Sequence, residues 1–64
     1  MVNIKYDITL KSGVTISVIG HELTIEDGLV KILYYDEEGI EYILFVCRLA
    51  DMYTVVGGVI NESW

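Results

Sequence analysis

Apolar and polar residues alternate along residues 3–18 with one interruption. Apolar side chains stand at Ile4, Tyr6, Ile8 and Leu10, and the alternation resumes at Val14 after Ser12-Gly13. Successive side chains of a β-strand point to opposite faces, so this period of two predicts strands over residues 3–11 and 14–19, each with one apolar face. Gly13 supplies the positive φ that a tight turn requires, which predicts a hairpin.

The remaining pattern predicts further strands. Residues 23–26 alternate briefly before Asp27-Gly28, a dipeptide typical of a hairpin turn. Residues 29–35 and 40–49 are apolar at both odd and even positions, so we expect both runs to be covered on both faces. Residues 52–60 form the last expected strand, and Gly57-Gly58 within it indicates a bulge, a sharp bend or a close backbone approach.

The expected fold is all-β and comprises a single domain, residues 1–64. Five or six strands joined by short turns would leave one face bare as a flat sheet. We therefore expect a small antiparallel sheet curled into a five- or six-stranded barrel, or sheets paired across a dimer. A helix is not predicted, because no window shows a sustained period of 3.6; at most one helical turn fits, at residues 48–53.

The composition predicts a partner. The chain has 64 residues, of which 53% are hydrophobic, and a domain this small has little interior for them. Cys47 is the only cysteine and His21 the only histidine, so an internal disulfide is impossible and a structural metal is poorly supported. Self-association or binding to another protein would cover the surplus, and the alternative is that these residues fill a compact barrel.

The net charge of −6 disfavours direct binding to nucleic acid or to anionic lipid, because both require a positive protein surface. It fits either simple solubility or attraction to a basic partner. The longest apolar stretch, residues 42–47, is far shorter than the roughly 20 residues of a membrane-spanning helix. Residues 1–5 lack the pattern of a secretory signal, so we expect a cytoplasmic protein.

The densest acidic patch lies in residues 36–41 and is flanked by tyrosines. It is interpreted in three ways: a solvated hairpin loop, a contact patch for a basic surface, or a cation site, although its spacing does not fit a Ca²⁺ loop. Tyrosine combines apolar area with a polar tip and is enriched at interfaces, and a terminal tryptophan is expected to dock onto the domain or onto a neighbour. The predicted protein-binding residues are Tyr34, Tyr35, Asp36, Glu37, Glu38, Glu41, Tyr42 and Trp64.

Catalysis is not expected. His21 has no companion nucleophile in the sequence pattern, and Cys47 lies in the most apolar strand, where burial as a small hydrophobic residue is the expected role. Motifs for phosphate binding, nucleophile elbows and zinc sites are missing. We therefore expect no enzyme, no cofactor and no metal.

The stretches 6–16 and 23–29 resemble the opening of short acidic β-proteins of bacteriophages and mobile elements, and residues 49–56 resemble their final bend and strand. The opening hairpin is also similar to Sm and SH3-like small barrels. The chain lacks the RNA-binding residues and the net positive charge of the Sm family. The phage resemblance implies a protein that binds and blocks a host enzyme or defence factor.

These observations predict a non-catalytic protein-interaction module that self-associates and binds a protein partner. The alternative is a structural or accessory component that packs into a larger particle.

Overall fold

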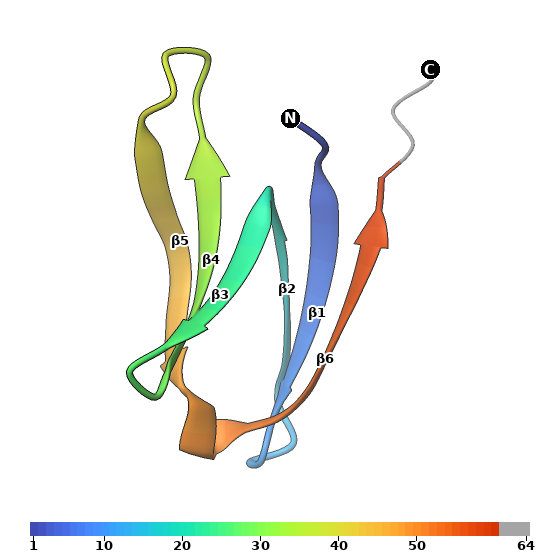
Figure 1. Cartoon of the computed structure of the whole chain (residues 1–64). Helices are drawn as coiled ribbons and strands as arrows, with labels where there is room; N and C mark the ends of the chain where they lie inside the picture. Colours follow the sequence, from blue (N-terminus) through green and yellow to red (C-terminus); the bar gives the residue numbers. More distant parts are fainter. Residues whose placement is uncertain (61–64) are drawn as a thin grey trace.

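The computed structural model describes residues 1–60, so the predicted binding residue Trp64 lies outside the described part. Six strands form two three-stranded antiparallel sheets, with strand orders β2-β1-β6 and β3-β4-β5 (Figure 1). The elements are β1 (Ile4–Leu10), β2 (Thr15–Gly20), β3 (Glu22–Glu26), β4 (Leu29–Tyr35), β5 (Glu41–Arg48), a 3-10 turn η1 (Leu49–Asp51) and β6 (Met52–Val59). The all-β class and the single helical turn are confirmed.

The turns follow the glycine positions of the sequence. Gly13 has φ +95° between β1 and β2, and Asp27 and Gly28 have φ +53° and +73° between β3 and β4. Two consecutive positive φ values characterise the tight hairpin turn whose twist matches that of the flanking strands. Both predicted hairpins are therefore present.

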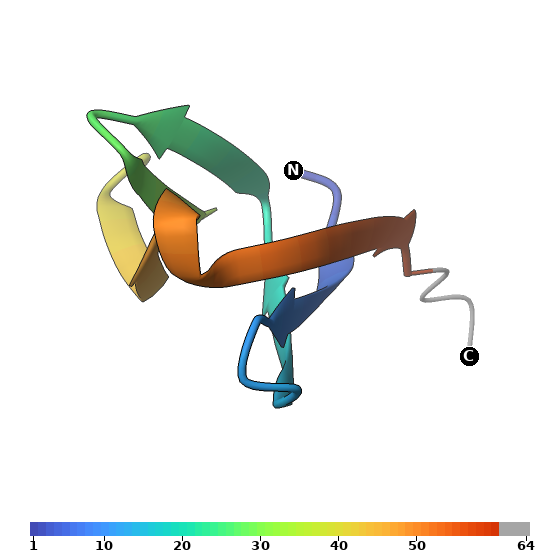
Figure 2. The same ribbon diagram turned by 90° about the horizontal axis from the view of Figure 1, so that it is seen from below.

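The expected barrel is not closed. Within residues 1–60, strand pairing occurs only inside each sheet, so β2 and β6 keep free edges in one sheet and β3 and β5 in the other (Figure 2). The chain crosses between sheets at a corner after β2, where the His21 N–H donates to the Leu33 carbonyl at 2.8 Å. The apolar alternation predicted the strands. The corner after β2 divides them into two layers, and this is why the expected single curled sheet is not formed.

The core lies between the layers and is thin. Tyr6 and Ile8 of β1 are buried against Ile32 of β4, and the partly buried Phe45 and Val55 pack on this cluster. The smallest extent of the molecule is only 12 Å, about the spacing of two packed sheets. One layer of side chains from each sheet therefore makes up the interior.

Two glycines permit close backbone approaches. A Cβ at Gly20 would lie 2.7 Å from Ile32 Cγ2, and one at Gly57 would lie 3.2 Å from the ring of Tyr6. Of the three interpretations of Gly57-Gly58, close approach is therefore the correct one for Gly57. The register shift between β1 and β6 lies elsewhere, at Thr9/Leu10.

The expectation that both apolar runs are covered on both faces is wrong for β5. β4 is the central strand of its sheet, and its Val30, Ile32 and Leu33 are buried. β5 is an edge strand, in which Ile43 and Val46 remain 55% and 51% exposed. Part of the surplus apolar surface of the chain therefore lies on β5.

Candidate protein-binding site

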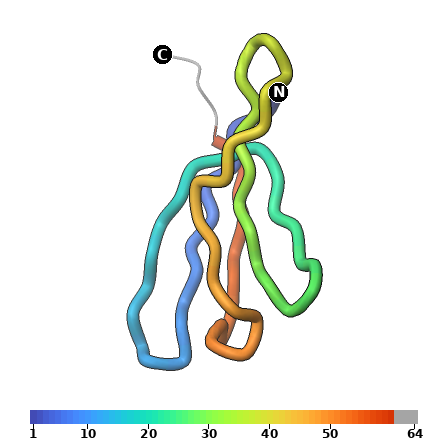
Figure 3. Tube along the Cα trace, turned by 90° about the vertical axis from the view of Figure 1, so that its left-hand side faces the viewer, coloured from blue at the N-terminus to red at the C-terminus, as the bar shows by residue number. Residues whose placement is uncertain are grey.

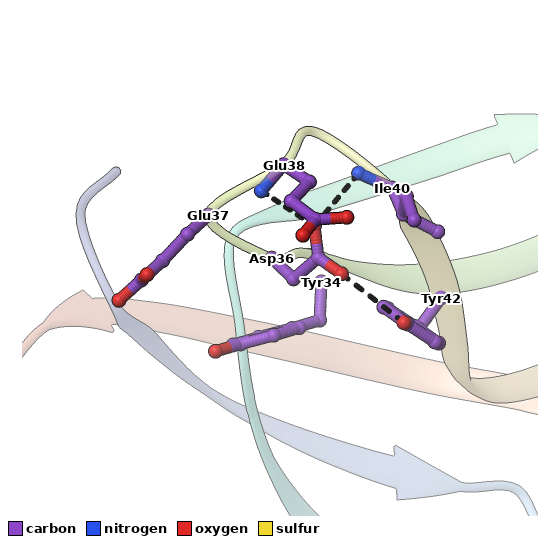
Figure 4. A pocket seen from close by; sticks show the side chains of 6 residues that line it. All are labelled: Tyr34, Asp36, Glu37, Glu38, Ile40 and Tyr42. Atoms are coloured by element: carbon purple, nitrogen blue, oxygen red, sulfur yellow. Dashed lines mark hydrogen bonds between the residues drawn. The ribbon is translucent and has the colours of Figure 1, made fainter.

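Residues 36–40 connect β4 to β5 at the end of the molecule opposite the two tight hairpin turns (Figure 3), and residues 36–39 of this connection are here called the acidic loop. Beside it lies a solvent-open hollow of about 480 Å³ (Figure 4). The residues that line the hollow come from this connection and from the two strand ends that flank it: Tyr34, Asp36, Glu37, Glu38, Ile40 and Tyr42.

Asp36 holds the loop in shape. Its Oδ1 accepts hydrogen bonds from the backbone N–H groups of Glu38 and Ile40, both at 2.9 Å, and its Oδ2 accepts one from the Tyr42 hydroxyl at 3.1 Å. The bond from Ile40 is the main reason that the pKa of the Asp36 carboxyl lies below its ordinary value of 3.8. Gly39, with φ +82°, completes the turn. Asp36 is thus a structural residue of the site.

Glu37 and Glu38 are the available carboxylates of the site. Both are exposed, and their side chains make no hydrogen bond or ion pair with the described residues. Figure 4 shows the Glu37 side chain extending away from Ile40 and Tyr42, to the side of the loop where the Tyr34 ring also points. The loop therefore presents the negative charges of Glu37 and Glu38, whereas the Asp36 carboxylate is occupied by hydrogen bonds within the loop.

The wall of the hollow is aromatic. Tyr34 and Tyr42 are cross-strand neighbours on β4 and β5, and their ring centroids lie 6.4 Å apart. The His21 ring stacks on Tyr34 at a centroid distance of 4.5 Å and an interplanar angle of 22°. These contacts restrict the Tyr34 ring and give the hollow a firm apolar side.

His21 is itself held by two hydrogen bonds. Its Nδ1 accepts the Tyr35 backbone N–H at 3.0 Å, so its Nε2 carries the hydrogen and donates to Asn3 Oδ1 at 3.0 Å. The neutral ring joins the β2–β3 corner to the end of β4. The break in alternation at Gly20-His21-Glu22 indicates a loop or a corner, and the structure has the corner.

Tyr35 and Glu41 form a separate cluster that does not line the hollow. The Tyr35 hydroxyl donates to Glu22 Oε2 at 2.9 Å and contacts Glu41 Oε1 at 3.3 Å. The hydrogen bond to Glu22 and the negative charge of both carboxylates raise the pKa of Tyr35 to about 12. Neighbouring strand residues face opposite sides, which explains why Tyr34 and Tyr35 take different roles.

The structure thus brings together five of the predicted residues and separates two. Tyr34, Asp36, Glu37, Glu38 and Tyr42 share the hollow, whereas Tyr35 and Glu41 lie beside it. Sequence reasoning missed Ile40, which lines the hollow next to the loop. Its position immediately after Gly39 was the only signal.

The two residues considered for catalysis are unsuited to it in this arrangement. Both His21 ring nitrogens are engaged as described above. Burial raises the pKa of the Cys47 thiol, which disfavours the reactive thiolate. Within residues 1–60, no three side chains of His, Cys, Asp or Glu are grouped to hold a metal ion, and none of these residues forms a helix long and apolar enough to cross a membrane.

The chain matches no protein-family model, no curated protein and no solved structure.

Proposed function

We propose that the protein is a non-catalytic interaction module that binds a basic side chain of another protein in the hollow beside the acidic loop. The observation that carries this proposal is the pairing of an aromatic wall with two carboxylates that have no partner among the described residues. A Lys or Arg side chain has an apolar stem and a charged end. The stem fits the wall of Tyr34 and Tyr42, and the charged end fits Glu37 and Glu38.

The physical chemistry of such a contact sets its character. A cation near an exposed aromatic face contributes about 0.5–1 kcal/mol, and exposed carboxylates add a contribution that salt screens. The net charge of −6 also speeds encounter with a positive surface. We therefore expect binding that is selective for basic protein surfaces and weakens as salt rises.

The resemblance to short phage proteins suggests the biological setting. A host enzyme or defence factor that acts on nucleic acid carries a basic surface, and the acidic loop is suited to covering it. The partner in this proposal is the protein and not the nucleic acid, whose phosphates the chain would repel.

The experiment is a titration of isotope-labelled protein with a lysine-rich peptide, followed by NMR. We expect shifts concentrated at residues 34–42, and weaker binding by the double variant Glu37→Gln/Glu38→Gln. The matched control is Glu26→Gln/Asp27→Asn, which removes two carboxylates at the opposite end of the sheet. Equal weakening by both double variants would show that only net charge matters, and would overturn the proposed site.

A structural or accessory role in a larger particle is the second candidate function. The observation that favours it is the exposed apolar surface of the two edge strands β5 and β6, where Leu44 and Val56 are 47% and 62% exposed. Pairing of different edges in successive copies would produce open-ended association. Light scattering distinguishes the two functions, because a closed oligomer has a fixed mass and an open assembly grows with concentration.

The fold is also part of the proposal: we interpret it as an opened small barrel of the SH3/Sm kind. In support, the chain turns from β2 into β3 at a sharp corner, and β6 returns after the 3-10 turn η1 to pair with β1. That arrangement places the last strand beside the first, as in a closed barrel. The remaining difference is the missing pairing between the two sheets.

A further inference from the structure

The free edge of β5 is open to pairing. Its eight residues, Glu41–Arg48, bond to β4 on one side only. Edge strands of soluble proteins are commonly protected by an internal charge, a proline or a β-bulge. β5 has no proline, its two charged residues, Glu41 and Arg48, stand at its two ends, and its one irregularity is a bulge at Leu44.

The pairing of β5 with β4 contains a shift that changes which face each side chain occupies. Ile32 lies opposite Phe45 but Leu33 lies opposite Ile43, so Leu44 is an extra residue, as in a β-bulge. Cross-strand partners share a face of the sheet. The partners on β4 therefore divide β5 into one face with Glu41, Ile43, Val46 and Arg48, and another with Tyr42, Phe45 and Cys47.

From this division we infer that β5 pairs antiparallel with β5 of a second copy of the chain, with Glu41 opposite the second copy's Arg48. In that register Tyr42 lies opposite the second copy's Cys47, and Ile43 opposite its Val46. This inference goes beyond the proposed function: it takes up the self-association expected from the composition and names its partner and its contact.

Symmetry supports this register. A two-fold axis perpendicular to a sheet keeps every side chain on its own face, so residues opposite each other must share a face. In a strand without a bulge, this condition is met only by registers in which one residue lies opposite the same residue of the second copy. The extra residue Leu44 shifts the alternation of side chains between the two faces by one residue. Glu41 and Arg48 therefore lie on the same face. A shift of one residue would set Glu41 opposite Cys47, which lies on the other face.

Charge selects β5 as its own partner. Among the four strands with a free edge in residues 1–60, Arg48 is the only cation, since β2 and β6 have no charged residue and β3 has only Glu22 and Glu26. The guanidinium donates through Nε to Asp51 at 2.9 Å, with Nη2 at 3.4 Å, and is exposed. Its remaining donors are free to bond the second copy's Glu41.

The same register gathers apolar surface. Ile43 and Val46, each about half exposed, meet the same two residues of the second copy on one face. The result is a continuous six-stranded sheet whose central apolar cluster has a charged pair at each end. The pairing thus covers the surplus apolar surface of β5 and its unpaired backbone groups together.

The first test is sedimentation over a range of concentrations. We expect a monomer–dimer equilibrium that Glu41→Arg weakens about tenfold, because two cross-strand pairs become repulsive. The double variant Glu41→Arg/Arg48→Glu should dimerise more tightly than either single variant. Glu26→Arg, which makes the same charge change on β3, should leave dimerisation unchanged. A monomer at all concentrations, or a double variant no better than the singles, would overturn the inference.

The second test addresses the register. Under mild oxidation, Tyr42→Cys should form a cross-linked dimer through the native Cys47, whereas the unmodified chain should not, because its two Cys47 residues lie far apart. The matched control is Thr54→Cys on β6. Cross-linking of the unmodified chain indicates another β5 register, and cross-linking of Thr54→Cys indicates a β5–β6 contact; either result contradicts the inference.

The outcomes are separable from those of the proposed function. Glu37→Gln/Glu38→Gln should leave the dimer intact while it weakens peptide binding. A protein that dimerises but does not bind the peptide overturns only the proposed function, and one that binds the peptide as a monomer overturns only the β5 contact.

Discussion

Gly20 lies directly against Ile32, so that a Cβ at Gly20 would come within 2.7 Å of Ile32 Cγ2 and 2.9 Å of the Leu33 carbonyl oxygen. This contact seats the end of β2 on β4 and joins the two sheets. The carbonyl belongs to the backbone and cannot rotate away. The absence of a side chain at Gly20 is therefore a condition for the thin core to close.

The first prediction concerns this contact. Gly20→Ala should lower the free energy of unfolding by about 1–3 kcal/mol, because the added methyl group overpacks the core. The measurement is a urea melt. Gly58→Ala is the matched control, since a Cβ there meets no atom within 4 Å, and it should have little effect. Equal stability of the two variants would contradict the role of Gly20.

A second prediction concerns His21. His21→Ala should lower the free energy of unfolding by about 1–3 kcal/mol, because it leaves the Tyr35 N–H without its acceptor and removes the ring stacked on Tyr34. Chemical denaturation measures the change. Tyr53→Ala, at a ring that is 75% exposed, is the control and should be nearly neutral. A His21 variant as stable as this control would show that the corner does not need the ring.

The third prediction is the pH dependence of the acidic loop. The pKa of Asp36 is lowered in the folded state, chiefly by the Ile40 N–H. Its stabilising effect is therefore complete above the ordinary value of 3.8 and is lost as the pH falls through the lower folded value. Hydrogen exchange at Glu38 and Ile40 should show increased opening in acid, and Asp36→Asn should show it already at neutral pH. Loop protection that is independent of pH in the unaltered protein would contradict this account.

The fourth prediction concerns alkaline pH. The pKa of Tyr35 is raised from 10.0 to about 12 by Glu22 and Glu41, so the Tyr35 bonds contribute stability below pH 10 that is lost as the pH rises through about 12. Spectrophotometric titration should resolve one tyrosine that ionises late. Glu22→Gln should return it toward the ordinary value, and Glu26→Gln should not. A late tyrosine that persists in Glu22→Gln would assign the raised pKa to another cause.

The positions of most strands and tight turns along the chain were predictable from the sequence, because both depend on neighbouring residues. The alternation at Ile4, Tyr6 and Ile8 reflects the two faces of one strand, and the observed β4, Leu29–Tyr35, has the predicted bounds. Asp27-Gly28 adopts positive φ because these residues tolerate it. The acidic patch and its flanking tyrosines were also visible in the order of residues.

The tertiary structure alone decided which apolar strand is covered and which side chains meet. Residues 29–35 and 40–49 have the same kind of pattern, and only the order of pairing makes β4 central and β5 an edge. Likewise, His21 reaches Tyr34 because a corner folds one sheet onto the other, and Tyr35 leaves the hollow because it faces the other side. The sequence by itself determined local conformation, which depends on adjacent residues. Burial and the composition of the site depend on contacts between residues far apart in the chain, which the local pattern does not encode.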